Sequence, residues 1–249
     1  SRDVKNAIVR AADEVLEGKM DNQFPLPALM GGAGTSIHMN MNEVLANRAT
    51  EILHKAGRKT VVHPNDHVNR SQSTNDVNPS AIKVAAVPLL NRLVVVLQDL
   101  GYSFEKKSMQ FKNIIKLART HLQDAVPIIL GEEFAAYAYI IKRHEHEVKR
   151  VMLAALTLHL GGTAAGNSVN ASPKYIKAVY RELKKVTKQQ FKPGKNFLSF
   201  SASQGDFLAI SQAVTALCMD VSKIAGDIRL MSSCPRGGLG EITLAELQN

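Results

Sequence analysis

Two long stretches with apolar residues spaced three and four positions apart constrain the fold of this chain most. One runs from residue 77 to about residue 111, and the other from about residue 128 to residue 160. This spacing is typical of α-helices that bury one face. A helix of about 30 residues is about 45 Å long, more than a compact single-chain bundle of this size needs. The pattern therefore predicts an all-α fold, a bundle of long helices whose apolar faces pack against partner chains.

Local start and stop signals place the remaining helices. Apolar spacing predicts a helix over the first residues of the chain (Val4, Ile8, Ala11, Val15). Ser172 followed by Pro173 predicts the start of a helix that continues to about residue 186, because proline fits the first helical position. A last long helix is expected over about residues 205–231, and a surface loop over residues 188–203. We expect the chain to be almost all helix, since no convincing polar–apolar alternation is bounded by hairpin turns.

Composition narrows the class of protein. With 249 residues and 45% hydrophobic content, the chain is long enough to bury a substantial core. The net charge of +9 would allow nucleic-acid binding, but the basic residues alternate with glutamates and lack interleaved aromatic residues, so we expect no nucleic-acid partner. No apolar run reaches the length of a membrane span, and we expect no membrane partner. The two cysteines, Cys218 and Cys234, fit a reducing compartment and predict a cytoplasmic protein.

Three polar segments each precede an apolar-periodic stretch, at residues 31–43, 63–76 and 118–127. The unpaired N–H groups and the dipole of a helix start attract anions, so hydroxyls, amides and an imidazole there predict a carboxylate site. Each segment also has a simpler interpretation. Thr120, Ser73 and Thr74 could only cap helices, and His121 could be an ordinary surface imidazole.

The amino-acid sequences of these segments resemble those of the superfamily of class II fumarases and aspartate ammonia-lyases. The motifs occur in the family's order as GGAGTS from Gly31, NDHVN from Asn65, QSTND from Gln72, THLQDA from Thr120 and SSCPRGGLGEI from Ser232. The match covers nearly the whole chain, and the full series is highly specific. QSTND and LQDAVP resemble aspartases more than fumarases, which tend to carry QSSND and LQDATP.

The resemblance implies an architecture. In the family, the central domain is a bundle of long helices that forms a homotetramer, and loops of three subunits build each active site. Residues 1–20 would end an N-terminal helical region, and residues 21–249 would form the central bundle. The family's catalytic base is a serine on a loop of the form GSSxMPxKxN, which is expected to follow Asn249. We therefore expect the sequence as given to be truncated and inactive by itself.

The resemblance also implies a reaction, the reversible anti elimination of ammonia from L-aspartate to give fumarate. Its intermediate is a doubly charged aci-carboxylate, which preorganised donors stabilise, each by about 3 kcal/mol in a dry site. The alternative activity is that of a class II fumarase, acting on malate and fumarate. A second alternative is a non-catalytic helical assembly module.

Site residues carry over by position. The resemblance implies substrate-binding donors at Thr35, Ser73, Thr74 and Asn75, catalytic roles for Thr120 and His121, and an accessory anion site at His63, Asn65 and Asp66. We expect a small dicarboxylate substrate and no cofactor. We also expect no metal, because Pro64 interrupts the spacing of His63 and His67, while His144 and His146 would point apart on a helix.

Four positions depart from the family's wording. His38 stands where Asn is usual, Asn167 and Ser168 lie in a loop that is usually of the GTG type, and Cys234 stands where Gly is usual. These departures bear on the fit of the pocket and leave the predicted fold unchanged.

Overall fold

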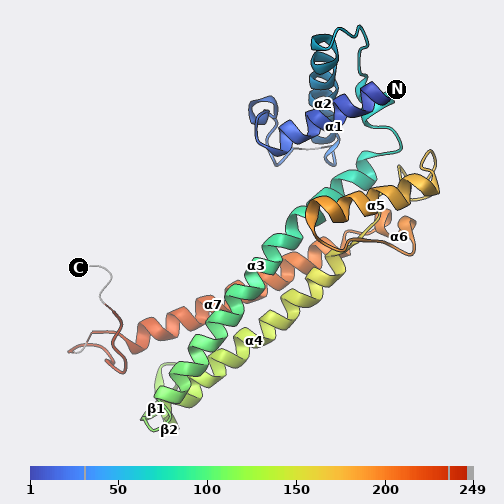
Figure 1. Cartoon of the computed structure of the whole chain (residues 1–249). Coiled ribbons are helices and arrows are strands. Elements are labelled where there is room, and N and C mark those ends of the chain that lie inside the picture. The colour runs from blue at the N-terminus through green and yellow to red at the C-terminus, as the bar shows by residue number, and fades with distance from the viewer. Residues whose placement is uncertain (31, 235, 246–249) are drawn as a thin grey trace. The chain divides into compact units, whose positions relative to one another are not determined.

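The computed structural model describes residues 1–30, 32–234 and 236–245 of the chain. These residues divide into two compact units, one built from Ser1–Ala85 and Leu156–Ser203, the other from Ala86–Ala155 and the described residues after Ser203. Long helices dominate the structure, which confirms the predicted all-α class (Figure 1). The helix α3 (Thr74–Gln110) gives its first residues to one unit and its remainder to the other.

In the first unit, α1 (Arg2–Leu16) packs against α2 (Thr35–Lys55). Ala11, Ala46 and Ala49 are buried in the cluster that joins them, and such short side chains let two helices approach closely. An ion pair between Arg48 and Glu14 links the same helices. The short helical turns η1 (Asp21–Gln23) and η2 (Pro64–Val68) lie in the connections before and after α2.

The later part of the first unit confirms one prediction and corrects another. The helix predicted after Ser172 is α5 (Pro173–Thr187), and the Ser172 hydroxyl caps it by accepting from the Tyr175 N–H. The predicted loop over residues 188–203 instead contains β4 (Lys192–Pro193), paired in parallel with β3 (Thr157–Leu158), and the short helix α6 (Phe197–Ala202). Backbone bonds to a strand more than thirty residues earlier order this segment, and local composition carries no such signal.

The second unit is built around three long helices that lie side by side, α3, α4 (Leu130–Ala155) and α7 (Gly205–Met231) (Figure 1). Edge-on aromatic contacts fill one part of its core, among Phe104, Phe111, Phe134 and Tyr137. At the start of α4, a Cβ on Gly131 would lie 2.5 Å from the carbonyl oxygen of Ser108. The glycine therefore permits the close approach of α4 to the end of α3.

The segment around Thr120 differs from its prediction. Residues 118–127 were expected at the mouth of a helix, but they belong to an antiparallel hairpin of β1 (Ile115–Thr120) and β2 (Gln123–Ile129). His121 and Leu122 form its two-residue turn, both at positive φ. The prediction that this segment lies at the start of a helix was therefore wrong.

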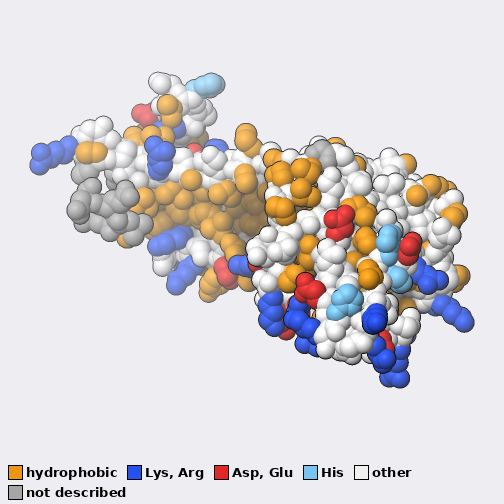
Figure 2. Space-filling view, turned by 90° about the horizontal axis from the view of Figure 1, so that it is seen from above, with side chains coloured by type: hydrophobic (Ala, Val, Ile, Leu, Met, Phe, Trp, Pro, Cys, Tyr) orange, Lys and Arg blue, Asp and Glu red, His pale blue; other side chains and the backbone are white. Residues whose placement is uncertain are grey.

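Apolar side chains remain exposed on the long helices, as the orange surface on the left of Figure 2 shows. More than half of the side-chain surface is open at Leu89, Val95 and Val96 of α3, Tyr139 and Leu153 of α4, and Leu208 and Met219 of α7. By length and mean hydropathy, α3 and α7 reach the range of membrane-crossing helices, which the sequence reading did not anticipate. Helices in the core of soluble proteins reach that range as well. The exposed apolar faces therefore predict contact either with other protein chains or with a membrane.

Candidate functional site

The polar loop before α3 is organised by Asp76, a fully buried carboxylate. One of its oxygens accepts from the backbone N–H of Ser73 at 2.9 Å. The other accepts from the N–H groups of Gly161 and Thr163, each at 2.9 Å. Two of these charge-assisted bonds join the start of α3 to the glycine loop that follows β3 (residues 161–170), and the third holds the loop before α3. Asp76 was quoted within QSTND but was not among the predicted site residues.

A cavity of about 880 Å³ opens beside this loop. Of the predicted site residues, Ser73, Thr74, Asn65 and Asp66 line it. The other lining residues come from the same two loops: Asn69, Arg70, Ser71, Gln72, Thr163, Ala164, Ala165, Asn167, Val169 and Asn170. Hydroxyls, amides, one guanidinium and the carboxylate of Asp66 therefore surround a space large enough for a small dicarboxylate.

Asn75, in the first turn of α3, makes two bonds to the segment around the glycine loop. Its side-chain amide donates to the carbonyl of Ala164 at 2.8 Å, and its own carbonyl lies 2.8 Å from Nε2 of His159. The ring of His159 is buried and stacks on Phe200. Asn75 is not among the residues that line the cavity, and its contacts serve to hold the glycine loop in place.

Thr35 begins α2, directly after Gly34, which adopts the left-handed conformation. At this positive φ a side chain would be strained, and a Cβ on Gly34 would also lie 2.2 Å from the side-chain nitrogen of Asn78 on α3. One turn later, the Nδ1 atom of His38 lies 2.9 Å from the Thr74 hydroxyl. Burial lowers the pKa of His38, and the nearby carboxylate of Asp76 opposes this effect in part.

His63 lies at the start of η2, where its Nδ1 atom accepts from the backbone N–H groups of Asn65 and Asp66. The Nδ1 atom of His67 accepts from the N–H of His63 at 2.9 Å. A helical turn therefore does form across Pro64, which occupies its first position, so the reason given against a shared metal site was wrong. Within the described ranges, no group of three or more His, Cys, Asp or Glu residues is placed to hold a metal ion.

Thr120 and His121 belong to the second unit, at the tip of the β1–β2 hairpin. Thr120 ends β1 and lies ten residues before α4, so it does not cap a helix. Both residues are exposed. The structure thus groups Ser73, Thr74, Asn65 and Asp66 in one unit and presents the Thr120–His121 pair from the other.

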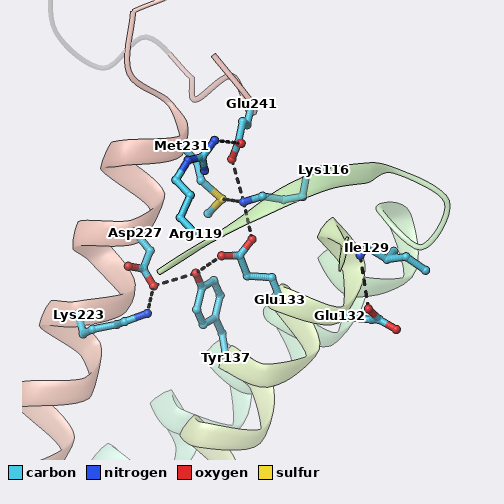
Figure 3. Close-up of polar contacts among 10 residues, drawn as sticks. All are labelled: Lys116, Arg119, Ile129, Glu132, Glu133, Tyr137, Lys223, Asp227, Met231 and Glu241. Atoms are coloured by element: carbon cyan, nitrogen blue, oxygen red, sulfur yellow. Dashed lines mark hydrogen bonds and ion pairs between the residues drawn. The ribbon is translucent and has the colours of Figure 1, made fainter. Parts of the chain in front are cut away.

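A network of ion pairs holds this hairpin, and sequence reasoning did not find it (Figure 3). Lys116 on β1 contacts Glu133 at 2.7 Å and Glu241 at 2.8 Å, and its side chain is only 7% exposed. Arg119 on the same strand also pairs with Glu241. Burial alone would raise the pKa of Glu241, but the hydrogen bonds and charges of Arg119 and Lys116 outweigh it and lower that pKa.

The same network continues to α7. The Tyr137 hydroxyl donates to Asp227 at 2.9 Å, and Lys223 pairs with that carboxylate. Burial and these acidic neighbours raise the pKa of Tyr137 far above its usual value, so it stays a donor. A smaller cavity of about 290 Å³ opens here, lined by Lys116, Arg119, His121, Leu122, Glu133, Lys223, Asp227, Leu230 and Met231.

Comparisons with known proteins agree with this architecture. The model of a family described as lyase matches residues 2–249. Aspartate ammonia-lyase of Bacillus subtilis (strain 168) is 43% identical over 246 residues, which cover 98% of this chain and 52% of that protein. Aspartate ammonia-lyase of Escherichia coli (strain K12) is 41% identical over 249 residues, which cover 99% of this chain and 52% of that protein.

Solved structures give the same result for the fold. The fumarate lyase:delta crystallin of Brucella melitensis bound to cobalt superposes with a TM-score of 0.90 at 41% identity, covering 100% of this chain and 54% of that one. The class II fumarase of Schistosoma mansoni superposes with a TM-score of 0.91 at 32% identity, covering 100% of this chain and 55% of that one. The chain spans about half the length of the relatives that it matches. Sequence and fold together confirm that the chain belongs to the lyase family, in the superfamily of aspartate ammonia-lyases and class II fumarases.

Proposed function

We propose that the full-length protein is an aspartate ammonia-lyase, which eliminates ammonia from L-aspartate to give fumarate. The observation that carries the proposal is the cavity at the start of α3, where Ser73 and Thr74 meet the amides of the 161–170 loop. Such donors suit the carboxylates of the substrate and the doubly charged intermediate. The names of the relatives at 41–43% identity support aspartate as the substrate.

In the proposed assembly, Thr120 and His121 at the hairpin tip of one subunit complete the site of another. The positive φ of His121 in a two-residue turn presents its imidazole at the end of a paired ribbon. The ion pairs of Lys116 and Arg119 tie that ribbon to Glu133 of α4 and to Glu241, which limits the motion of the two side chains. In this proposal, Thr120 donates to a substrate carboxylate and His121 stabilises the charge that develops during proton removal.

The proposal includes a homotetramer in which loops of different subunits build each site. Its support is the set of exposed apolar residues on α3, α4 and α7, since contiguous apolar surface on long helices is typical of subunit interfaces. Light scattering of the full-length protein at micromolar concentration should give the mass of four chains. A stable monomer would contradict this assembly.

We further propose that the protein works in the cytoplasm without a cofactor or metal and without a nucleic-acid or membrane partner. Both cysteines are exposed free thiols, in keeping with a reducing compartment. The predicted accessory anion site at His63, Asn65 and Asp66 stays a prediction. In the structure, the His63 ring is engaged in bonds of its own turn, and Asn65 and Asp66 line the cavity.

The test is an ultraviolet assay of fumarate formation by the full-length protein. L-Aspartate should be converted much faster than L-malate. The opposite ranking would establish the alternative, a class II fumarase, which the likeness to the Schistosoma mansoni enzyme favours. A folded tetramer that converts neither substrate would support the non-catalytic assembly module.

A further inference from the structure

His38 is a buried polar side chain that the proposed reaction does not use directly. It lies in the first turns of α2, is 6% exposed, and is not among the residues that line the cavity. Its Nδ1 atom lies 2.9 Å from the hydroxyl oxygen of Thr74, which does line the cavity. His38 thus stands directly behind a proposed substrate donor.

The protonation of His38 decides what Thr74 can do. Because burial lowers the pKa of the ring, His38 is neutral near neutral pH and carries one N–H. If the proton is on Nε2, the Thr74 hydroxyl must donate to Nδ1, and its only hydrogen turns away from the cavity. If the proton is on Nδ1, the ring donates to Thr74, and the hydroxyl hydrogen is free for a ligand.

The surroundings of the ring favour the second arrangement. The Nε2 atom is buried and has no hydrogen-bond partner among the residues that the structure describes. A proton on Nε2 would therefore be a buried donor left without an acceptor, a situation that folded proteins rarely tolerate. With the proton on Nδ1, the ring's donor is satisfied by Thr74, and only a lone pair is left on Nε2.

We propose that His38 is a positioning residue that donates from Nδ1 to the Thr74 hydroxyl and commits that hydroxyl to donating into the cavity. Thr74 then offers its hydrogen to a carboxylate, while one of its two lone pairs accepts from the His38 ring. The proposal rests on the proposed function in one respect, the placing of a substrate carboxylate at Thr74. It gives a chemical role to a residue that stands where the family usually has Asn.

The first test reads the tautomer and needs no ligand. Solid-state ¹⁵N NMR of histidine-labelled protein distinguishes protonated from unprotonated ring nitrogens, and the signals lost in His38→Asn assign those of His38. We expect a protonated Nδ1 and an unprotonated Nε2. A protonated Nε2 with an unprotonated Nδ1 would overturn the inference whether or not the protein binds a dicarboxylate.

The second test compares two replacements of equal shape in the full-length protein. In His38→Asn the amide occupies the place of Nδ1 and can donate to Thr74, whereas His38→Leu fills the same space without a donor. His38→Leu loses one hydrogen bond to a group that binds a charge, so its dissociation constant for fumarate should rise about tenfold. The dissociation constant of His38→Asn should stay within about threefold of the wild-type value. His144→Leu, which removes a buried histidine bonded to Asp220 in the second unit, is the matched control and should leave fumarate affinity unchanged.

A third variant separates positioning from packing. In a Thr74→Val background the hydroxyl is absent, so His38→Leu should change the fumarate dissociation constant less than about twofold. A full tenfold loss in that background would show that His38 acts through packing, and His38→Leu binding as tightly as wild type would also overturn the inference. A wild-type protein that shows the Nδ1 proton but binds no dicarboxylate would contradict the proposed function while supporting the bond to Thr74.

Discussion

Replacing Glu241 by Gln tests how the hairpin that carries Thr120 and His121 is held. Glu241 lies beyond the end of α7 and is the shared partner of Lys116 and Arg119, the two cations of β1 (Figure 3). Glutamine keeps the shape of the side chain and removes its charge. The cluster of Lys116, Arg119, Glu133 and Glu241 then passes from a balance of charges to one unpaired positive charge.

The expected loss of stability follows from burial. Removing one partner of a fully buried ion pair costs about 3–5 kcal/mol, because the other charge stays desolvated. Here the side chains of Glu241 and Arg119 are 15% and 19% exposed, and Lys116 keeps its contact with Glu133. These features reduce the expected loss to about 2 kcal/mol.

Urea unfolding followed by circular dichroism measures this loss as a lower midpoint at unchanged slope. Glu182→Gln is the matched control, since Glu182 pairs with Arg181 and Lys185 on the exposed face of α5. Exposed pairs contribute little, so the control should leave the urea midpoint close to that of wild type. An equally small effect of Glu241→Gln would refute the view that this ion cluster holds the hairpin.

The pH dependence of stability gives a second test of the role of the Glu241 charge. The pKa of Glu241 is lowered in the folded protein, because its cationic partners outweigh the effect of burial. Its contribution should therefore be complete above the unfolded value of about 4.3 and be lost as the pH falls through the folded value. The stability difference between wild type and Glu241→Gln should shrink below about pH 4. A difference that grows on acidification would contradict this assignment.

Four further substitutions test the site and its support. Asp76→Asn should lower the free energy of unfolding by about 2–3 kcal/mol, since it removes the charge that accepts three backbone N–H groups, and an unchanged urea midpoint would contradict that role. Thr120→Ala and His121→Ala should each lower kcat/KM of the full-length protein by about 10²-fold or more, with helicity and tetramer mass retained. Near wild-type turnover in both would remove the pair from the site. Gly131→Ala should destabilise the second unit by about 1–3 kcal/mol, because its Cβ meets the Ser108 carbonyl, and a wild-type melting temperature would refute the close contact.

The sequence was sufficient for elements that depend on local signals. α5 begins at Pro173 with Ser172 as its cap, and α7 spans Gly205–Met231, as predicted. In both cases apolar spacing and residues at the helix ends carry the information, and these act within a few positions. The family motifs likewise led to Ser73 and Thr74, which line the large cavity.

The hairpin could not be predicted in the same way. Its turn consists of His121 and Leu122, both at positive φ, although the residues that favour such turns are Asn, Asp and Gly. What stabilises it is distant in sequence, because Arg119 and Glu241 are 122 positions apart. A sequence pattern that spans only a few residues cannot reveal that two residues so far apart in the sequence form an ion pair.

The same reason explains what was missed around the cavity. Asp76 organises the loop through backbone groups more than eighty positions away, and His38 reaches Thr74 across 36 positions. The motif showed that an acid follows Asn75 and that His38 departs from the usual residue. Only the fold shows that Asp76 binds the glycine loop and that His38 lies against Thr74, the proposed substrate donor.

Hybrids of two inactive variants of the full-length protein test most directly the proposal that different subunits build each lyase site together. One carries Ser73→Ala and Thr74→Val in the cavity of the first unit, and the other carries Thr120→Ala and His121→Ala at the hairpin tip of the second. If loops of different subunits build each site, co-expressed hybrids contain some sites with both loops intact. Hybrid tetramers should therefore form fumarate from L-aspartate at a measurable rate, whereas hybrids of confirmed tetramer mass that are no more active than either parent would contradict the account.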